Sequence, residues 1–105
     1  MGDDIVLRDS DGNLIVLTRE RLSHITEHPE ISLIEDPVAT TVLSPDAVVR
    51  SRTDETISLL YKFYENLTIG DKYCCVVIKY AEQRNFIVTA YMTDRIKEGN
   101  VLWKK

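Results

Sequence analysis

The chain has 105 residues, of which 44% are hydrophobic and 29% are charged, a composition typical of a single folded domain and not of a disordered chain. No apolar run approaches the length of a membrane helix, and the acidic start Met1–Asp4 lacks the basic and then apolar pattern of a secretory signal. The net charge of −4 counts against a large nucleic-acid-binding surface, because phosphate contacts usually require a surplus of Lys and Arg. We therefore expect one cytoplasmic domain without a membrane partner, in which any nucleic-acid site is small and supplied with local cations.

The N-terminal part of the chain predicts a β-hairpin followed by a helix. Two short apolar runs, 5–8 and 14–17, flank a polar loop that contains Asp11-Gly12, which is a strong hairpin signal. Thr18 is a suitable N-cap for a helix over residues 19–28. Pro29 ends that helix, because a residue that precedes proline disfavours helical geometry.

A second helix and then a run of strands follow. Asp36-Pro37 fits a cap with proline at the first helical position, and Ser44-Pro45-Asp46 closes the helix. The periodicity then changes to two, which predicts four successive strands over residues 47–52, 56–64, 72–80 and 85–93. The tail through Trp103 is expected to form a turn and an aromatic anchor. The expected fold class is α+β, with an N-terminal hairpin and helices packed on a C-terminal four-stranded antiparallel sheet.

The two cysteines, Cys74 and Cys75, are adjacent in a strand-like run. Neighbouring strand residues point to opposite faces, so this pair is poorly placed for a disulfide and lacks the spacing of a metal site. We expect two reduced cysteines that pack in the interior, in agreement with a reducing compartment.

The last two predicted strands allow a finer inference about their pairing. If their apolar residues share one face, that face holds Cys74, Val76, Ile78 and Tyr80 with Phe86, Val88, Ala90 and Met92. The opposite face then holds Cys75, Val77 and Lys79 with Ile87, Thr89, Tyr91 and Thr93. Lys79, Thr89 and Tyr91 would thus share one partly polar face of the sheet, which makes that face a candidate site.

Two histidines spaced four residues apart, His24 and His28, lie on one face of the first predicted helix. The string from His24 to His28 matches a zinc-hydrolase signature, but such a site needs a third ligand and Pro29 frays the helix, so we rank this interpretation last. A second interpretation is that His28 only caps the helix C-terminus. A third interpretation is that these histidines transfer protons or contact phosphate, since an imidazole can gain or lose a proton near neutral pH.

RNA cleavage by internal transesterification uses side chains of the types found here. It needs a base for the 2′-hydroxyl, an acid for the leaving oxygen and donors for the charge on the phosphoryl oxygens, and it needs no metal. Arg50-Ser51-Arg52 fits a phosphate clamp, since guanidinium matches phosphate geometry in a fork. The alternative for these arginines is a solvated strand end.

Several pieces of the chain, taken together, resemble a known family. The pieces are His24-Ile25, His28-Pro29-Glu30, Ser44-Pro45-Asp46, Val76–Tyr80, Phe86–Tyr91, and Ile96-Lys97 with Gly99 through Trp103. Their order and spacing, over residues 14–103, resemble the phage-type branch of nucleases with the barnase–EndoU–colicin–RelE-like (BECR) fold.

The resemblance implies a small RNA endonuclease that uses the open face of an antiparallel sheet and requires no cofactor or metal. The implied catalytic residues are His28, His24, Thr89 and Tyr91. The phosphate-contacting candidates are Arg50, Lys79 and Arg52. The resemblance also implies an RNA substrate and a toxin-like or mobile-element role, with a cognate antitoxin or immunity protein as partner. The main alternative is a non-catalytic domain of the same fold that binds a protein or a nucleotide-like ligand.

Overall fold

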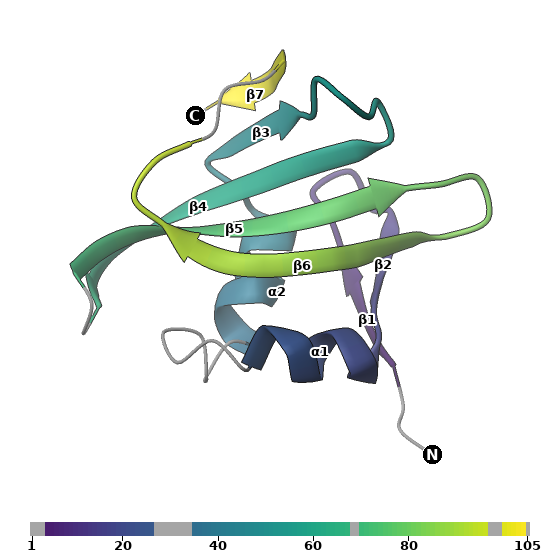
Figure 1. Cartoon of the computed structure of the whole chain (residues 1–105), viewed down its shortest axis with the longest axis horizontal. Helices are drawn as coiled ribbons and strands as arrows, with labels where there is room; N and C mark the ends of the chain where they lie inside the picture. The colour runs from purple at the N-terminus through teal and green to yellow at the C-terminus, as the bar shows by residue number, and fades with distance from the viewer. Residues whose placement is uncertain (1–3, 27–34, 68–69, 97–99, 105) are drawn as a thin grey trace.

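Strands dominate the described part of the chain. The computed structural model describes residues 4–26, 35–67, 70–96 and 100–104 (Figure 1). The elements in this part are β1 (Ile5–Arg8), β2 (Leu14–Leu17), α1 (Arg19–Thr26), α2 (Glu35–Leu43), β3 (Ala47–Arg50), β4 (Ile57–Leu67), β5 (Gly70–Tyr80), β6 (Asn85–Thr93) and β7 (Asn100–Lys104). Neither of these helices is long and apolar enough to cross a membrane.

All the described strands belong to one mixed sheet. The strand order is β1-β2-β6-β5-β4-β3-β7, and every neighbouring pair is antiparallel except β2 and β6, which run parallel. The predicted fold class, α+β with an N-terminal hairpin and helices packed on a four-stranded antiparallel sheet, is therefore wrong, because the hairpin is part of a larger mixed sheet and the described helices are short. The four predicted strands form only the middle of a larger sheet.

Two additions at the sheet edges explain the difference. Without β2, the nine-residue strand β6 would be an open edge, and open edges are prone to pair with other strands. The hairpin covers part of this edge through Ile15–Val16, which pair with Asn85–Phe86. At the other edge the tail, expected to be a turn and an anchor, instead forms β7 and pairs with β3.

The hairpin itself forms as predicted, and Asp9 holds its turn. The Asp9 carboxylate accepts hydrogen bonds from the backbone N–H of Asp11 (3.0 Å) and from both the N–H (2.8 Å) and the side chain (3.0 Å) of Asn13. Gly12 has a φ of 85°, which a residue with a side chain rarely adopts. The turn is therefore fixed by local chemistry that the sequence already contains.

The first helix begins at its predicted cap. The Thr18 hydroxyl accepts a hydrogen bond from the backbone N–H of Arg21 at 3.1 Å, which satisfies one of the free donors at the helix start. The helix α1 is described as far as Thr26, and the remaining predicted part, with His28, lies outside the described residues. Ile25 on α1 is 1% exposed and packs toward the sheet.

The two faces of the sheet differ in what covers them. One face packs against the helices, and its cluster joins Ile25, Val38 and Val42 of the helices to strand residues such as Val76 and Ile78. The other face has its own cluster, which contains Ala47, Val49, Leu59, Tyr61 and Cys75 and no described helix residue. In Figure 1 α2 passes behind the strands β4 to β6, so the viewer looks at the helix-free side. We call this side the open face.

The pairing of β5 with β6 follows the prediction along only part of its length. Val76 faces Ala90 and Val77 faces Thr89, as expected. A bulge then leaves Val88 without a partner on β5, so Ile78 faces Ile87. The bulge buries Ile87 completely beside Ile78 on the helix side. It moves Phe86, predicted to be on the core face, to a position opposite Lys79.

Candidate functional site

Cross-strand rows of residues build the open face. Thr89, Val77 and Leu59 form one row, and Tyr91, Cys75 and Tyr61 form the next. Successive strand residues alternate between faces, so each row lies on the same side as its neighbour two residues along. The predicted grouping of Lys79, Thr89 and Tyr91 on one face is therefore confirmed by the register.

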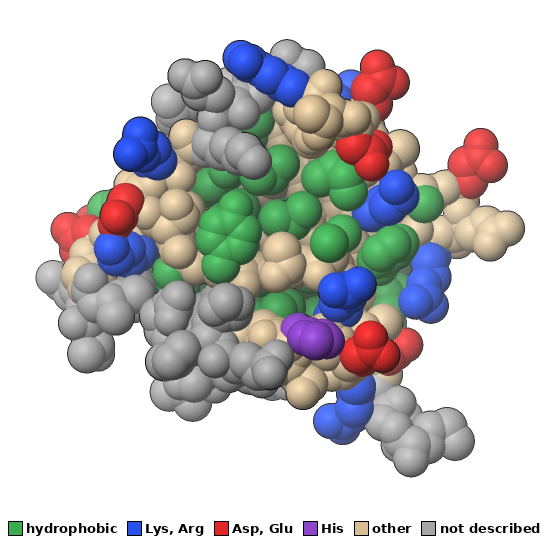
Figure 2. Space-filling view, in the orientation of Figure 1, with side chains coloured by type: hydrophobic (Ala, Val, Ile, Leu, Met, Phe, Trp, Pro, Cys, Tyr) green, Lys and Arg blue, Asp and Glu red, His purple; other side chains and the backbone are tan. Residues whose placement is uncertain are grey.

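The partly accessible residues of the open face are mostly apolar or aromatic. They form what we call the open-face patch: Ile57, Phe63, Tyr73, Val77, Lys79, Phe86, Thr89 and Tyr91. Beneath it, Tyr61 and Cys75 are almost fully buried. Figure 2 views this side and shows hydrophobic side chains gathered in the middle, with charged side chains around them.

Three rings give the patch an aromatic corner. The Phe63 and Tyr73 ring centres are 5.1 Å apart, and those of Tyr61 and Tyr73 are 6.2 Å apart with perpendicular planes. Edge-to-face contacts of this kind hold rings in defined orientations. Phe63 is 40% exposed although it packs on Tyr73. The corner thus presents a fixed apolar surface to the outside.

The cation of the patch, Lys79, is already paired. Its ammonium lies 3.5 Å from the Asp54 carboxylate in the loop between β3 and β4. Thr56 donates to Asp54 from both its N–H (2.9 Å) and its hydroxyl (2.6 Å). These hydrogen bonds hold the pKa of Asp54 below its ordinary value, and Lys79 adds to the effect. The carboxylate therefore stays ionised and offsets the charge of Lys79.

Tyr91 is a proton donor rather than a base. Burial raises the pKa of Tyr91, and the neighbouring Cys75 and Tyr61 raise it further. The phenol consequently keeps its proton throughout the neutral pH range. Tyr91 also packs against both hydrophobic clusters, so it has a structural role whatever its chemistry.

Arg50, the first arginine of the predicted phosphate clamp, does not join this group. Arg50 faces Ser58 on β4, and Ser58 faces Ile78, which belongs to the helix-side cluster. Strand alternation therefore places Arg50 on the opposite side of the sheet from Lys79. Arg52 follows in the exposed turn after β3. The family resemblance groups Arg50 with Lys79, but a resemblance does not determine the face of the sheet on which a residue lies.

Only one of the two predicted imidazoles, that of His24, belongs to the described residues. His24 is exposed on α1, the helix that packs through Ile25 into the helix-side cluster. The helix α1 lies against β6, the strand that carries Thr89 and Tyr91. His28 lies outside the described residues. Among the described residues no three His, Cys, Asp or Glu side chains are grouped to hold a metal ion.

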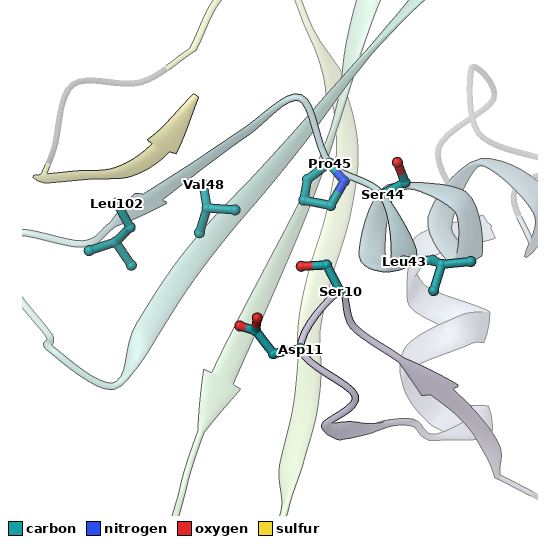
Figure 3. A pocket seen from close by; sticks show the side chains of 7 residues that line it. All are labelled: Ser10, Asp11, Leu43, Ser44, Pro45, Val48 and Leu102. Atoms are coloured by element: carbon teal, nitrogen blue, oxygen red, sulfur yellow. The ribbon is translucent and has the colours of Figure 1, made fainter. Parts of the chain in front are cut away.

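A pocket that the sequence does not indicate lies on the helix side. It has a volume of about 530 Å³ and is lined by Ser10, Asp11, Leu43, Ser44, Pro45, Val48 and Leu102 (Figure 3). None of the predicted site residues lines it. The lining comes from three stretches of the chain, 10–11, 43–48 and 102, so only the folded chain brings these residues together.

The chain was compared with known protein families, curated proteins and solved structures. No family model matches the chain, and neither a curated protein nor a solved structure matches it. The resemblance to BECR nucleases therefore stays a prediction from the sequence. The geometry of the described residues is therefore the evidence that bears on function.

Proposed function

We propose that this chain is a protein-binding module and that the open-face patch docks on a partner protein. The observation that carries the proposal is a contiguous, helix-free sheet face with partly exposed aromatic side chains at Phe63, Tyr73 and Tyr91. Aromatic residues are enriched at protein interfaces, and a cluster of exposed apolar side chains on a domain marks a site of interaction.

The charge of the patch favours a protein over a nucleic acid. Lys79 is paired with Asp54, and Arg50 lies on the opposite side of the sheet. The patch therefore offers phosphate groups no unpaired cation of its own, and the net charge of −4 repels a polyanion. An apolar surface of a protein gains from contact with these rings without needing positive charge.

The aromatic corner is suited to anchor such a partner. Tyr61 is buried below Tyr73, and their perpendicular rings hold Tyr73 in place before any partner arrives. A side chain that is already ordered loses little conformational freedom on binding. Anchor residues of this kind typically contribute about 2 kcal/mol or more when truncated to alanine.

Site-specific crosslinking tests this proposal. A photoreactive phenylalanine derivative at position 63 is expected to crosslink one discrete partner protein in the native cells. The same derivative at position 14 serves as the matched control, because Leu14 is 51% exposed but lies outside the patch. Equal crosslinking from both positions, or none from position 63, would contradict the proposal.

A second candidate function is metal-independent RNA cleavage. One observation favours it: Lys79, Thr89 and Tyr91 share a face, and the protonated phenol of Tyr91 is suited to donate to a leaving oxygen or a phosphoryl oxygen. In this scheme His28 or His24 supplies the base, and the substrate is RNA without a cofactor. A cognate antitoxin or immunity protein would then be the protein that covers the open face.

RNA cleavage that persists in EDTA and leaves a cyclic phosphate end would support this second candidate. Loss of the acid or the base typically slows such a reaction by about 10² to 10⁴-fold, so His28→Ala and Tyr91→Phe should lose most of the activity. Tyr64→Phe is the matched control, because its hydroxyl bonds the Pro37 carbonyl at 3.2 Å on the helix side. Cleavage that is equal in all three variants would point to a contaminating nuclease and exclude this function.

A further inference from the structure

The pocket on the helix side lies where opposite parts of the sheet come close. Ser10 and Asp11 belong to the turn of the β1–β2 hairpin, whereas Val48 and Leu102 belong to β3 and β7. The β1–β2 hairpin lies at one end of the strand order, and β3 and β7 lie at the other. The two ends nevertheless line one cavity together with the end of α2. The twist of the sheet accounts for this approach. We call the cavity the seam pocket.

One wall of the seam pocket is apolar and accessible. Figure 3 shows Val48 and Leu102 on one side of the gap, with Pro45 above Ser10 and Leu43 at the end of α2. Leu102 is 48% exposed and Leu43 is 57% exposed, although both are large apolar side chains. Covering such surface is favourable by about 25 cal/mol for each Å² removed from water.

The turn wall carries the acidic residue Asp11, whose backbone is held in place. The backbone N–H of Asp11 donates to Asp9 at 3.0 Å, and Tyr80 donates to the same Asp9 side chain at 3.0 Å, which ties the turn to β5. Among the described residues no hydrogen bond or ion pair engages the Asp11 carboxylate itself. In the described part of the chain, the turn wall therefore presents an acidic side chain without an ion-pair partner, and Arg8, the cation at the start of the turn, donates to the Gly12 carbonyl at 3.1 Å.

The end of α2 adds to this negative potential. Leu43 and Ser44 line the pocket at the C-terminus of the helix, where backbone carbonyls carry partial negative charge. The last turn of α2 contains no basic residue. Lys62 donates to the Ser44 carbonyl at 3.0 Å but also lies 4.0 Å from Asp46, so its charge is shared. The pocket as a whole suits an apolar group that carries a neighbouring cation.

We propose that the seam pocket binds a peptide segment of a partner protein in which a leucine-sized side chain adjoins a lysine or arginine. The apolar side chain covers Val48 and Leu102, and the cation meets Asp11 and the α2 carbonyl end. Val48 packs with the helix-side cluster, so this site is distinct from the open-face patch and does not depend on its function.

Titration of the isotope-labelled full chain with short capped peptides, followed by NMR, tests this proposal. The probe is Ac-Ala-Leu-Lys-Ala-NH2, and the controls replace its lysine with glutamate or its leucine with alanine. We expect the Leu-Lys peptide to shift the amide signals of Ser10, Asp11, Ser44, Val48 and Leu102 in a saturable manner. Both controls should bind at least about fivefold more weakly, and added salt should weaken the Leu-Lys peptide.

Two pairs of variants separate the roles of charge and apolar surface. Asp11→Asn should weaken the Leu-Lys peptide about two- to fivefold, whereas Glu82→Gln, an exposed acid outside the pocket, should leave it unchanged. Leu102→Thr should weaken it about fivefold, and Leu14→Thr, an equally exposed leucine on another strand, should not. The absence of pocket shifts, equal binding of the glutamate peptide or unchanged affinity in Asp11→Asn would each overturn the proposal.

Discussion

Burial controls the chemistry of individual side chains in this chain. Cys74 and Cys75 are both buried and unbonded to each other, as their adjacency predicts. Burial raises the pKa of the Cys74 thiol to about 11, and a hydrogen bond with Thr41 only partly opposes this shift. Nucleophilic cysteines have lowered pKa values, so the raised pKa of Cys74 fits a packing role.

The buried thiol makes stability depend on alkaline pH. An unfolded thiol ionises near pH 9, whereas folded Cys74 keeps its proton until about pH 11. Between these values the unfolded chain has released a proton that the folded chain retains, so stability falls as pH rises, by up to about 1.4 kcal/mol per pH unit. Urea unfolding from pH 7 to 11 measures this slope.

The variant Cys74→Ala should lower stability at every pH, because it leaves a small cavity, but it should flatten the slope between pH 9 and 10. Below pH 8 the variant and the natural chain should show the same dependence on pH. An unchanged alkaline slope in Cys74→Ala would show that the folded thiol titrates at its ordinary pKa.

At the scale of elements, one buried carboxylate joins the hairpin to the middle of the sheet. Asp9 is 6% exposed, and its carboxylate accepts from its own turn and from the Tyr80 hydroxyl of β5. Burial raises the pKa of Tyr80, and the negative charge of Asp9 raises it further, so the phenol remains a donor. Backbone pairing between β2 and β6 is limited to two residue pairs, so this side-chain link supports the short parallel contact.

Removal of this link should destabilise the chain measurably. Tyr80→Phe deletes a hydrogen bond to a buried charged group and is expected to lower the unfolding free energy by about 2 kcal/mol. Tyr64→Phe, which deletes a bond to the neutral Pro37 carbonyl, should cost only about 1 kcal/mol. Urea unfolding compares the two variants, and an equal or smaller loss in Tyr80→Phe would contradict the proposed role of Asp9.

At the scale of the whole molecule, the sequence predicts the elements better than their assembly. Alternating apolar residues place β5 and β6 and Thr18 places the start of α1, because both signals are local. No local sequence pattern predicts that β2 pairs with β6, or that the tail pairs with β3, because these contacts join segments that are distant in the sequence. The predicted four-stranded sheet fails for that reason.

The sequence likewise predicts only part of the candidate site. Strand alternation correctly groups Thr89 with Tyr91, because these residues lie on one strand. It could not foresee the bulge at Val88, which depends on how Ile87 fills the core, nor the face on which Arg50 lies. The Lys79–Asp54 pair likewise depends on where a loop folds back. Lys79, paired with Asp54, and Arg50, on the other side of the sheet, are thus less suited to contact phosphate from the open face than the sequence predicts.

The two faces of the molecule thus differ in chemistry. The open face presents ordered aromatic rings and a cation that is paired with Asp54, and the helix side presents a pocket lined by apolar side chains and by the acid Asp11. A domain with two such surfaces is suited to hold two partners, or two parts of one partner, at the same time. Whether the chain is a binding module depends on the open face.

Competition for the crosslinked partner tests that claim most directly. Unlabelled natural chain, Phe63→Ala and Leu14→Ala are each added in excess before the crosslinker at position 63 is activated. The natural chain and Leu14→Ala should abolish the crosslink at the same concentration, whereas Phe63→Ala should require at least about tenfold more. Equal competition by all three chains would show that the rings of the open face do not bind the partner.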